Sequence, residues 1–133
     1  MKNLLVLTNI YPAPDMEKEN TPVVHYFAKE WVNMGYDVRV IHYPANFPKL
    51  LMTGASLFKK QLSSWFGATI RTSQATEKEF ELEGVMVKRI PLLKFILHGA
   101  YSKRQKDRAY NSTIRYLHAQ RFLPDVIISH WVN

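Results

Sequence analysis

The residue that could most readily do chemistry in this chain is His130, which lies close to its last residue. Residues 124–131 read PDVIISHW, and the unbroken apolar run before Ser129 predicts a buried strand of a parallel sheet, covered on both faces. Ligands of open α/β sheets bind at the carboxyl ends of strands. An imidazole at such an end could contact a substrate, although a lone histidine there can also simply pack in a loop.

A second group of candidates follows the first apolar run, residues 4–8, which predicts the first strand. Thr21 and Pro22 predict a helix start, with Thr21 as the N-cap and Pro22 at the first helical position. If the first and last strands are neighbours where the sheet reverses direction, this helix start lies near His130 and its backbone N–H groups suit a phosphate. The catalytic candidate is therefore His130, and the substrate-binding candidates are Asn9, Tyr11, Thr21, Ser129 and Trp131.

The sequence lacks the motifs of several common nucleotide-binding, metal-binding and catalytic sites. There is no G-x-G-x-x-G after the first strand and no G-x-x-x-x-G-K-[ST], so neither a dinucleotide fingerprint nor a P-loop is predicted. The chain has no cysteine and no H-x-x-x-H pair, so no metal site is predicted. Ser129 and His130 do not indicate a catalytic triad, because adjacent strand residues point to opposite faces.

The net charge of +7 is concentrated in one half of the chain. Residues 84–133 hold nine Lys and Arg against two Asp, whereas residues 1–83 are balanced. A helix predicted over residues 102–122 places Tyr110, Ile114 and Leu117 on a buried stripe and collects basic residues on a separate flank. This field favours an anionic partner, although a solvated basic helix has the same composition. The flank contains Arg104, Arg108, Asn111 and Arg115.

The remaining elements fit the same plan. The first helix carries an apolar stripe of Val24, Phe27, Ala28 and Trp31, ends at Gly35 as a C-cap, and leads into a strand over residues 37–41. This is a βαβ unit. Alternating residues on both sides of Glu83-Gly84 predict a short hairpin or a kinked strand with its turn at these two residues and with a solvated glutamate face.

Residues 47–66 have apolar side chains at roughly helical spacing, with Lys59, Lys60 and Trp65 among them. Such a segment could lie on an anionic membrane surface, or it could cover the sheet as an ordinary helix. The sequence leaves both alternatives open.

Together the elements predict one α/β domain over residues 1–133: a Rossmann-like, mostly parallel sheet with helices on both faces. There is no room for the remaining strands of a full doubly wound sheet, so we expect a fragment of a longer protein. An exposed final strand would also invite pairing with a second copy of the chain.

Four segments resemble the retaining glycosyltransferases of the GT-B fold, of the group-one or family-four type. They are KNLLVLTNIYP at residues 2–12, GYDVRV at residues 35–40, EGVMVKRIP at residues 83–91 and PDVIISHW at residues 124–131. The family's corresponding patterns are an opening strand, G-H-x-V-x-V, x-G-V-x-V-x-R-x-P and P-D-V-I-H-A-H-W. The resemblance is spread over nearly the whole chain.

The resemblance implies two Rossmann-like domains facing across a cleft, of which this chain is the acceptor-side, N-terminal one. The missing C-terminal domain would bind the nucleotide sugar, which is a substrate, and catalysis would need no metal or cofactor. His130 matches the family's histidine at the reaction centre, where it contacts the donor sugar. The implied role is cell-surface polysaccharide or glycolipid synthesis in a bacterium, on a sugar or lipid-linked acceptor, in the cytoplasm or peripherally on the inner face of the membrane. The chain alone would be inactive.

The sequence departs from the family in three places. Residues 20–24 replace the glycine-rich turn of the loop after the first strand, and Pro22 has no N–H to offer a phosphate. Ile128 replaces the first histidine of H-A-H, and no two glutamates have the E-x7-E spacing of the donor domain.

The competing hypothesis is a non-enzymatic α/β module that binds a polyanion. Nucleic acid is disfavoured because the basic residues lack interleaved exposed aromatics.

Overall fold

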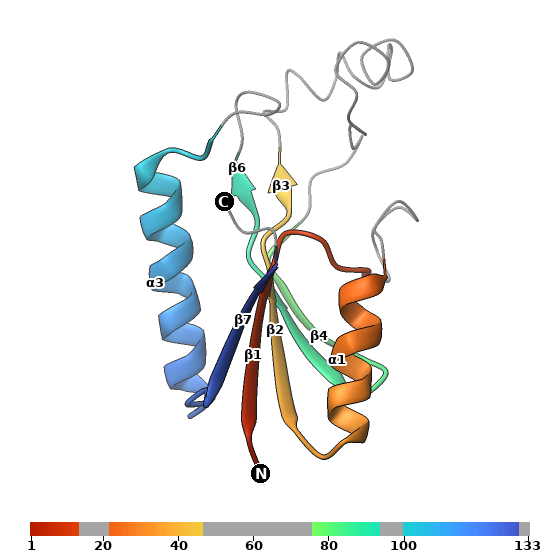
Figure 1. Cartoon of the computed structure of the whole chain (residues 1–133). Coiled ribbons are helices and arrows are strands. Elements are labelled where there is room, and N and C mark those ends of the chain that lie inside the picture. The colour runs from red at the N-terminus through yellow and green to blue at the C-terminus, as the bar shows by residue number, and fades with distance from the viewer. Residues whose placement is uncertain (14–21, 47–75, 94–99, 131–133) are drawn as a thin grey trace, which may run out of the picture.

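The computed structural model describes residues 1–13, 22–46, 76–93 and 100–130. Within them the chain forms a five-stranded, mostly parallel mixed sheet, two helices and a short two-stranded sheet (Figure 1). In chain order the elements are β1 (Asn3–Thr8), α1 (Val23–Asn33), β2 (Asp37–His42), β3 (Ala45–Asn46), β4 (Lys78–Leu82), β5 (Val85–Arg89), β6 (Leu92–Leu93), α3 (Lys103–Ala119) and β7 (Val126–His130).

The sheet has the strand order β4-β5-β2-β1-β7. β1 pairs in parallel with β2 on one side and with β7 on the other, β5 is parallel to β2, and only β4 is antiparallel. The chain therefore leaves β1 in one direction through α1 and returns on its other side through α3. This confirms that the first and last strands are neighbours at the point where the strand order reverses.

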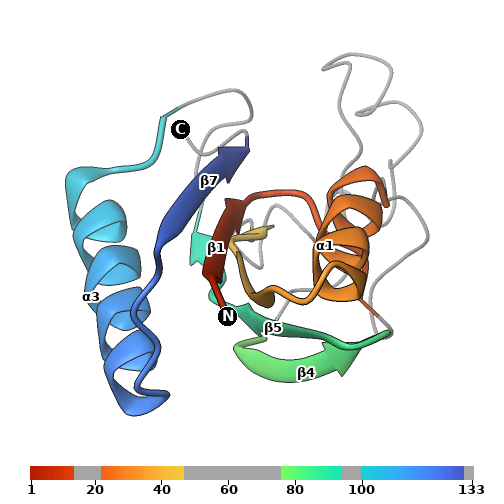
Figure 2. The ribbon, with the colours of Figure 1, turned by 60° about the horizontal axis from the view of Figure 1, so that its bottom comes forward.

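One described helix covers each face of the sheet (Figures 1 and 2). On the α1 face, β1, β2 and β5 bury alternate residues such as Leu4, Val40 and Val87 against Val24 and Ala28. The other face packs against α3. The core between this face and α3 contains the buried residues Leu5, Ile41, Tyr43, Ile90, Leu92, Ala109, Tyr116, Leu117 and Phe122.

Helix α1 begins one residue later than predicted, since Pro22 is its N-cap rather than its first residue. Its end agrees with the prediction, because Gly35 has a φ of 91° and its N–H binds the carbonyl of Val32 at 2.9 Å. Its predicted stripe is wrong at Phe27, which is 56% exposed and stacks on Trp31, while His25 is buried instead.

Helix α3 is capped by Ser102, whose hydroxyl accepts from the N–H of Gln105 at 3.3 Å. Its predicted buried stripe is only partly right: Leu117 is buried, whereas Tyr110 is 66% and Ile114 is 37% exposed. The helix instead buries Ala109, Thr113 and Tyr116, because its small residues let it approach the sheet closely and the Thr113 hydroxyl bonds Tyr43 at 2.7 Å.

Strand β7 is not buried on both faces as predicted. Val126 is exposed and Ile127 is 60% exposed. The cause is its position, since β7 lies at one end of the strand order and no strand among the described residues pairs with its outer edge.

The β4–β5 hairpin has its turn where predicted. Glu83 and Gly84 both have positive φ, 48° and 84°, which is the conformation of a two-residue type I′ turn. The backbone twist of this turn matches that of the strands it joins.

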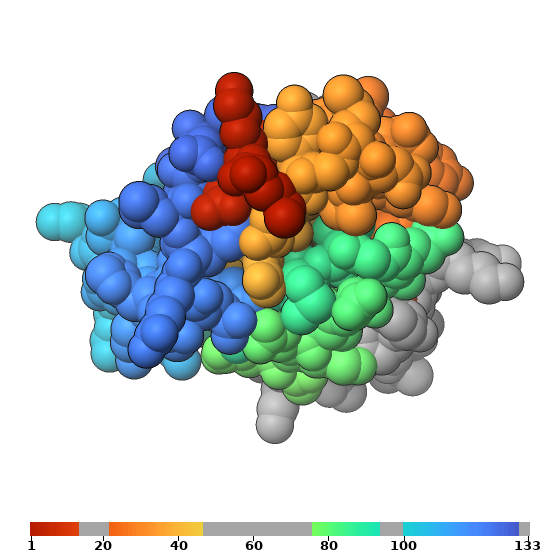
Figure 3. All heavy atoms as spheres, turned by 90° about the horizontal axis from the view of Figure 1, so that it is seen from below, coloured from red at the N-terminus to blue at the C-terminus, as the bar shows by residue number. Residues whose placement is uncertain are grey.

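The start of the chain, red in Figure 3, lies at the amino edge of the sheet, where Asn3 makes two hydrogen bonds. Its backbone N–H donates to the Asp125 carboxylate at 2.8 Å, and its side chain donates to the Leu123 carbonyl at 2.9 Å. These bonds fix the start of β1 to the turn that precedes β7.

Candidate functional site

Four parallel strands end on a row of polar residues. Thr8 of β1 pairs in register with His42 of β2 and with His130 of β7, and His42 pairs with Arg89 of β5. We call these four residues the edge row. They lie on the α1 face, because they continue the alternation of Val6, Val40, Val87 and Ile128.

Three members of the edge row are buried and bonded to the protein. The Thr8 hydroxyl accepts from the N–H of Ile10 at 3.1 Å, and His42 Nε2 lies 3.3 Å from the carbonyl of Asn9. Arg89 Nε donates to the carbonyl of Thr76 at 2.7 Å. His130 is the one member of the row that is only partly buried. Of these four side chains, His130 is therefore the most exposed.

Asn9 follows Thr8 directly, so the structure brings it close to the end of β7. Its Oδ1 is buried and accepts no hydrogen bond. Asn9 and His130 are thus the two predicted site residues that the fold brings together at the switch point. Ser129 precedes His130 on β7 and therefore points to the opposite face of the sheet, as expected.

Tyr11 is placed differently from a ligand-binding residue. Its side chain is fully buried, and its hydroxyl lies 2.7 Å from His25 Nδ1. Burial, together with the nearby Glu83 carboxylate, raises the pKa of the Tyr11 phenol well above its usual value. In the structure Tyr11 therefore fixes the loop after β1 from within the core.

His25 is buried and is the centre of a hydrogen-bonded network that the sequence did not reveal. Its Nε2 lies 2.7 Å from Glu83 Oε2, and the other oxygen of Glu83 accepts from Lys29 Nζ at 2.8 Å. The hydrogen bond from Lys29, followed by that from His25, lowers the pKa of the Glu83 carboxyl. The network joins the loop after β1 to α1 and to the β4–β5 turn. A signal existed, because His25 precedes the buried Ala28 by three residues and so shares its side of the helix.

Glu83 is exposed, as expected for the solvated glutamate face of the hairpin. Its side chain is half exposed but bonds both Lys29 and His25. Glu79 also has a partner, because it accepts a hydrogen bond from the Tyr116 hydroxyl at 2.8 Å. Burial, followed by this hydrogen bond, raises the pKa of Tyr116 to about 12.

Five predicted contacts lie outside the described residues and stay predictions. They are Thr21, Lys59, Lys60, Trp65 and Trp131.

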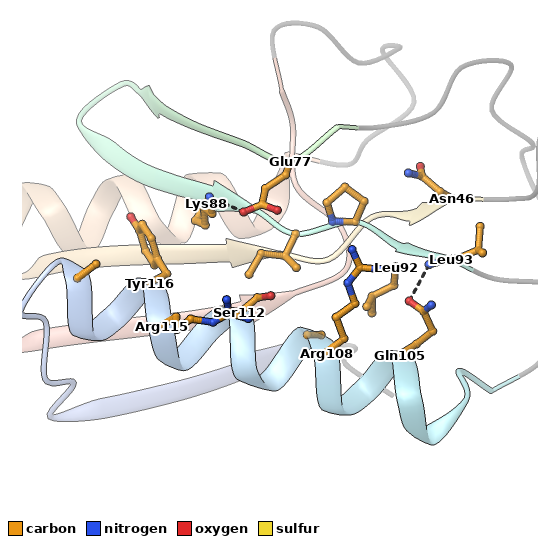
Figure 4. Close-up of a pocket in the computed structure, with 14 residues that line it drawn as sticks. Asn46, Glu77, Lys88, Leu92, Leu93, Gln105, Arg108, Ser112, Arg115 and Tyr116 are labelled. Atoms are coloured by element: carbon orange, nitrogen blue, oxygen red, sulfur yellow. Dashed lines mark hydrogen bonds and ion pairs between the residues drawn. The ribbon is translucent and has the colours of Figure 1, made fainter.

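Helix α3 is flanked by two hollows. The first, which we call the basic pocket, has a volume of about 720 Å³ and lies between α3 and the strands β5 and β6 (Figure 4). Arg108 and Arg115 line it, whereas Arg104, predicted on the same flank, does not, and all three side chains are exposed. The second, which we call the apolar groove, has a volume of about 570 Å³ and lies between α3 and β7. Tyr110, Ile114 and Ile127 line it.

The described residues contain no group of three or more His, Cys, Asp or Glu side chains placed to hold a metal ion. Neither α1 nor α3 is long and apolar enough to cross a bilayer.

In comparisons with known proteins, no protein-family model, no curated protein and no solved structure matches the chain.

Proposed function

We propose that this chain is the acceptor-side, Rossmann-like domain of a nucleotide-sugar glycosyltransferase, with His130 at the reaction centre. The observation that carries the proposal is the register of β7 on β1, which sets His130 beside Thr8 at the carboxyl edge. Open α/β sheets bind ligands in this position, where the strand order reverses. The four sequence segments that resemble the GT-B enzymes point to sugar transfer as the chemistry.

The role proposed for His130 is electrostatic. A glycosyl donor develops positive charge on its sugar and negative charge on its departing diphosphate. A partly buried imidazole can hydrogen-bond the sugar and hold it in place while this charge develops. The nucleotide would be held by a second domain facing this edge, and the acceptor by the edge itself near Asn9.

The test requires the protein translated from its complete reading frame. We expect it to release nucleoside diphosphate from one of UDP-glucose, UDP-N-acetylglucosamine or GDP-mannose. His130→Ala should slow this release by about 10²-fold or more, as the loss of a charge-stabilising donor does. His118→Ala, which removes an exposed histidine of α3, is the matched control and should have no effect. An active His130→Ala enzyme, or no turnover of any donor, would contradict the proposal.

We also propose that the enzyme works at an anionic membrane surface in the bacterial cytoplasm, where lipid-linked acceptors reside. The basic field of α3 and the residues Lys59, Lys60 and Trp65 would supply the attraction. Sedimentation with phosphatidylglycerol vesicles tests this for the wild type and for a variant with alanine at those three positions. Equal pelleting of the two proteins would remove these residues from the proposal.

The polyanion-binding module remains the second candidate, because α3 carries five Lys and Arg against the single Asp107. Tyr110 is exposed, contrary to expectation, and could in principle stack on a base. It lines the apolar groove, however, while Arg108 and Arg115 line the pocket on the other flank. A gel-shift titration with single-stranded RNA over a range of salt concentrations tests this candidate, and salt-sensitive binding would favour it over the transferase.

A further inference from the structure

We infer that the basic pocket beside α3 is a binding site for a small phosphate ester or diphosphate. The inference rests on the residues of the pocket and does not depend on the transferase proposal. It also separates Arg108 and Arg115 from Arg104, with which they had been grouped as one flank.

The two arginines of the pocket have no acidic partner. Neither Arg108 nor Arg115 makes an ion pair or a side-chain hydrogen bond within the described residues. Ser112 lies between them on the same side of the helix, at i+4 from one and i−3 from the other. Two guanidinium groups and a hydroxyl therefore line the α3 side of the pocket. Figure 4 shows the Arg108 side chain extending from α3 toward the strands.

The opposite wall does not cancel this charge. Lys88 of β5 is bound to Glu77 at 2.9 Å and lies over the Tyr116 ring. The Glu77 carboxylate, the only one that lines the described pocket, is thus already neutralised by a lysine. The unmatched charge is that of the two arginines, which suits a dianion.

The apolar lining of the pocket indicates that the ligand has an apolar organic part besides its phosphate. Ile90, Pro91, Leu92 and Ala109 give the pocket an apolar part beside the arginines. The volume of about 720 Å³ lies within the range of roughly 300–1,000 Å³ that is usual for sites of small ligands. Guanidinium groups form paired hydrogen bonds with phosphate and carboxylate alike, so it is the presence of two arginines, whose charges match a phosphate dianion, that favours phosphate over a single carboxylate.

A nucleic acid fits this pocket less well than a small phosphate ester. Its one aromatic lining residue is Tyr116, which is buried and has the Lys88 ammonium over its ring. No aromatic face among the lining residues is therefore open to stack a base.

The experiment uses isothermal titration calorimetry of the full chain with sodium diphosphate and with glycerol 3-phosphate. The double variant Arg108→Gln/Arg115→Gln should bind at least about tenfold more weakly, as expected for lost charge-assisted hydrogen bonds. The matched control is Lys103→Gln/Arg104→Gln, which removes the same charge from the same helix outside the pocket and should bind as the wild type does. Ser112→Phe, which fills the pocket without a change of charge, should also abolish binding.

A parallel experiment separates the two sources of phosphate. Phosphatidylcholine vesicles with and without phosphatidic acid present the same group as a lipid headgroup. Vesicle binding that needs Arg108 and Arg115 but not Lys103 and Arg104 supports the site with a lipid phosphate, and calorimetric binding with that dependence supports it with a soluble one. Equal losses in both double variants, retained binding by Ser112→Phe, or no binding of any probe would each overturn the inference.

Discussion

The two faces of the sheet use their polar residues in opposite ways. On the α1 face, the polar groups of Tyr11, His25 and Glu83 bond one another across three segments of the chain. On the α3 face, Arg108 and Arg115 line an open pocket, and the apolar residues Tyr110 and Ile127 line an open groove. Both faces are built on the same strands.

This difference separates stability from binding. Polar groups that satisfy one another inside a core make that core rigid and leave nothing to offer a ligand. Unmatched charge and exposed apolar surface are the features that a partner can use. We therefore expect substitutions of buried, bonded groups such as Tyr11 and His25 to change the free energy of unfolding, and substitutions of exposed residues that line the α3 hollows to change association.

The largest effect is expected where α3 touches the sheet. Leu117→Ala removes a buried side chain and should lower the free energy of unfolding by about 3 kcal/mol. Ile114→Ala, one turn away on the apolar groove, should cost less than about 1 kcal/mol. Urea titration followed by tryptophan fluorescence measures both. Equal losses would mean that the groove is closed in solution, with Ile114 as fully buried as Leu117.

The next largest effect on the free energy of unfolding is expected in the network of Tyr11, His25 and Glu83. His25→Leu leaves the Tyr11 hydroxyl buried without a partner, which should cost about 1–3 kcal/mol. Adding Tyr11→Phe removes that hydroxyl, so the double variant should be less destabilised than the sum of the two single variants. Tyr26→Phe, which removes an exposed hydroxyl from the same helix, is the control. Strict additivity would show that the two rings do not depend on each other.

A smaller effect is expected from pH. The folded-state pKa of Glu83 is lowered, so its contribution to stability is present at neutral pH and is lost as the pH falls below about 4.5, its ordinary value, toward the folded pKa. Glu83→Gln should therefore lower the melting temperature at pH 7 and have less effect at pH 3. Because this carboxylate is half exposed, the shift should be modest. Glu81→Gln, on the exposed side of β4, should show no such dependence on pH.

The sequence predicted the parts of the fold that depend on local rules. The βαβ unit, the Gly35 helix end and the Glu83-Gly84 turn follow from apolar periodicity and from the conformational freedom of glycine, both of which are visible in short windows. The adjacency of β1 and β7 followed from the usual order of such sheets.

The errors arose where tertiary packing decides burial. Periodicity identified α3 as amphipathic but placed Tyr110 and Ile114 inside, because it measures apolar character and not which side of the helix approaches the sheet. Likewise, the apolar run of β7 indicates a covered strand, yet its exposure depends on whether another strand lies beside it. The pairing of His25 with Glu83 joins residues 58 positions apart, and no local pattern could have shown it.

The smallest effect on stability, but a clear one on association, is expected at Ile127. This residue is exposed on the edge strand, and β7 carries no lysine or proline among its five residues to discourage pairing with another strand. If two copies of the chain pair through β7, Ile127→Lys should reduce dimer formation in sedimentation velocity while changing the free energy of unfolding of the monomer by less than about 0.5 kcal/mol. Tyr26→Lys, equally exposed on α1, should leave association unchanged. A chain that is monomeric at high concentration, or a Tyr26→Lys variant that dissociates equally, would show that the groove and its strand edge are not a self-association surface.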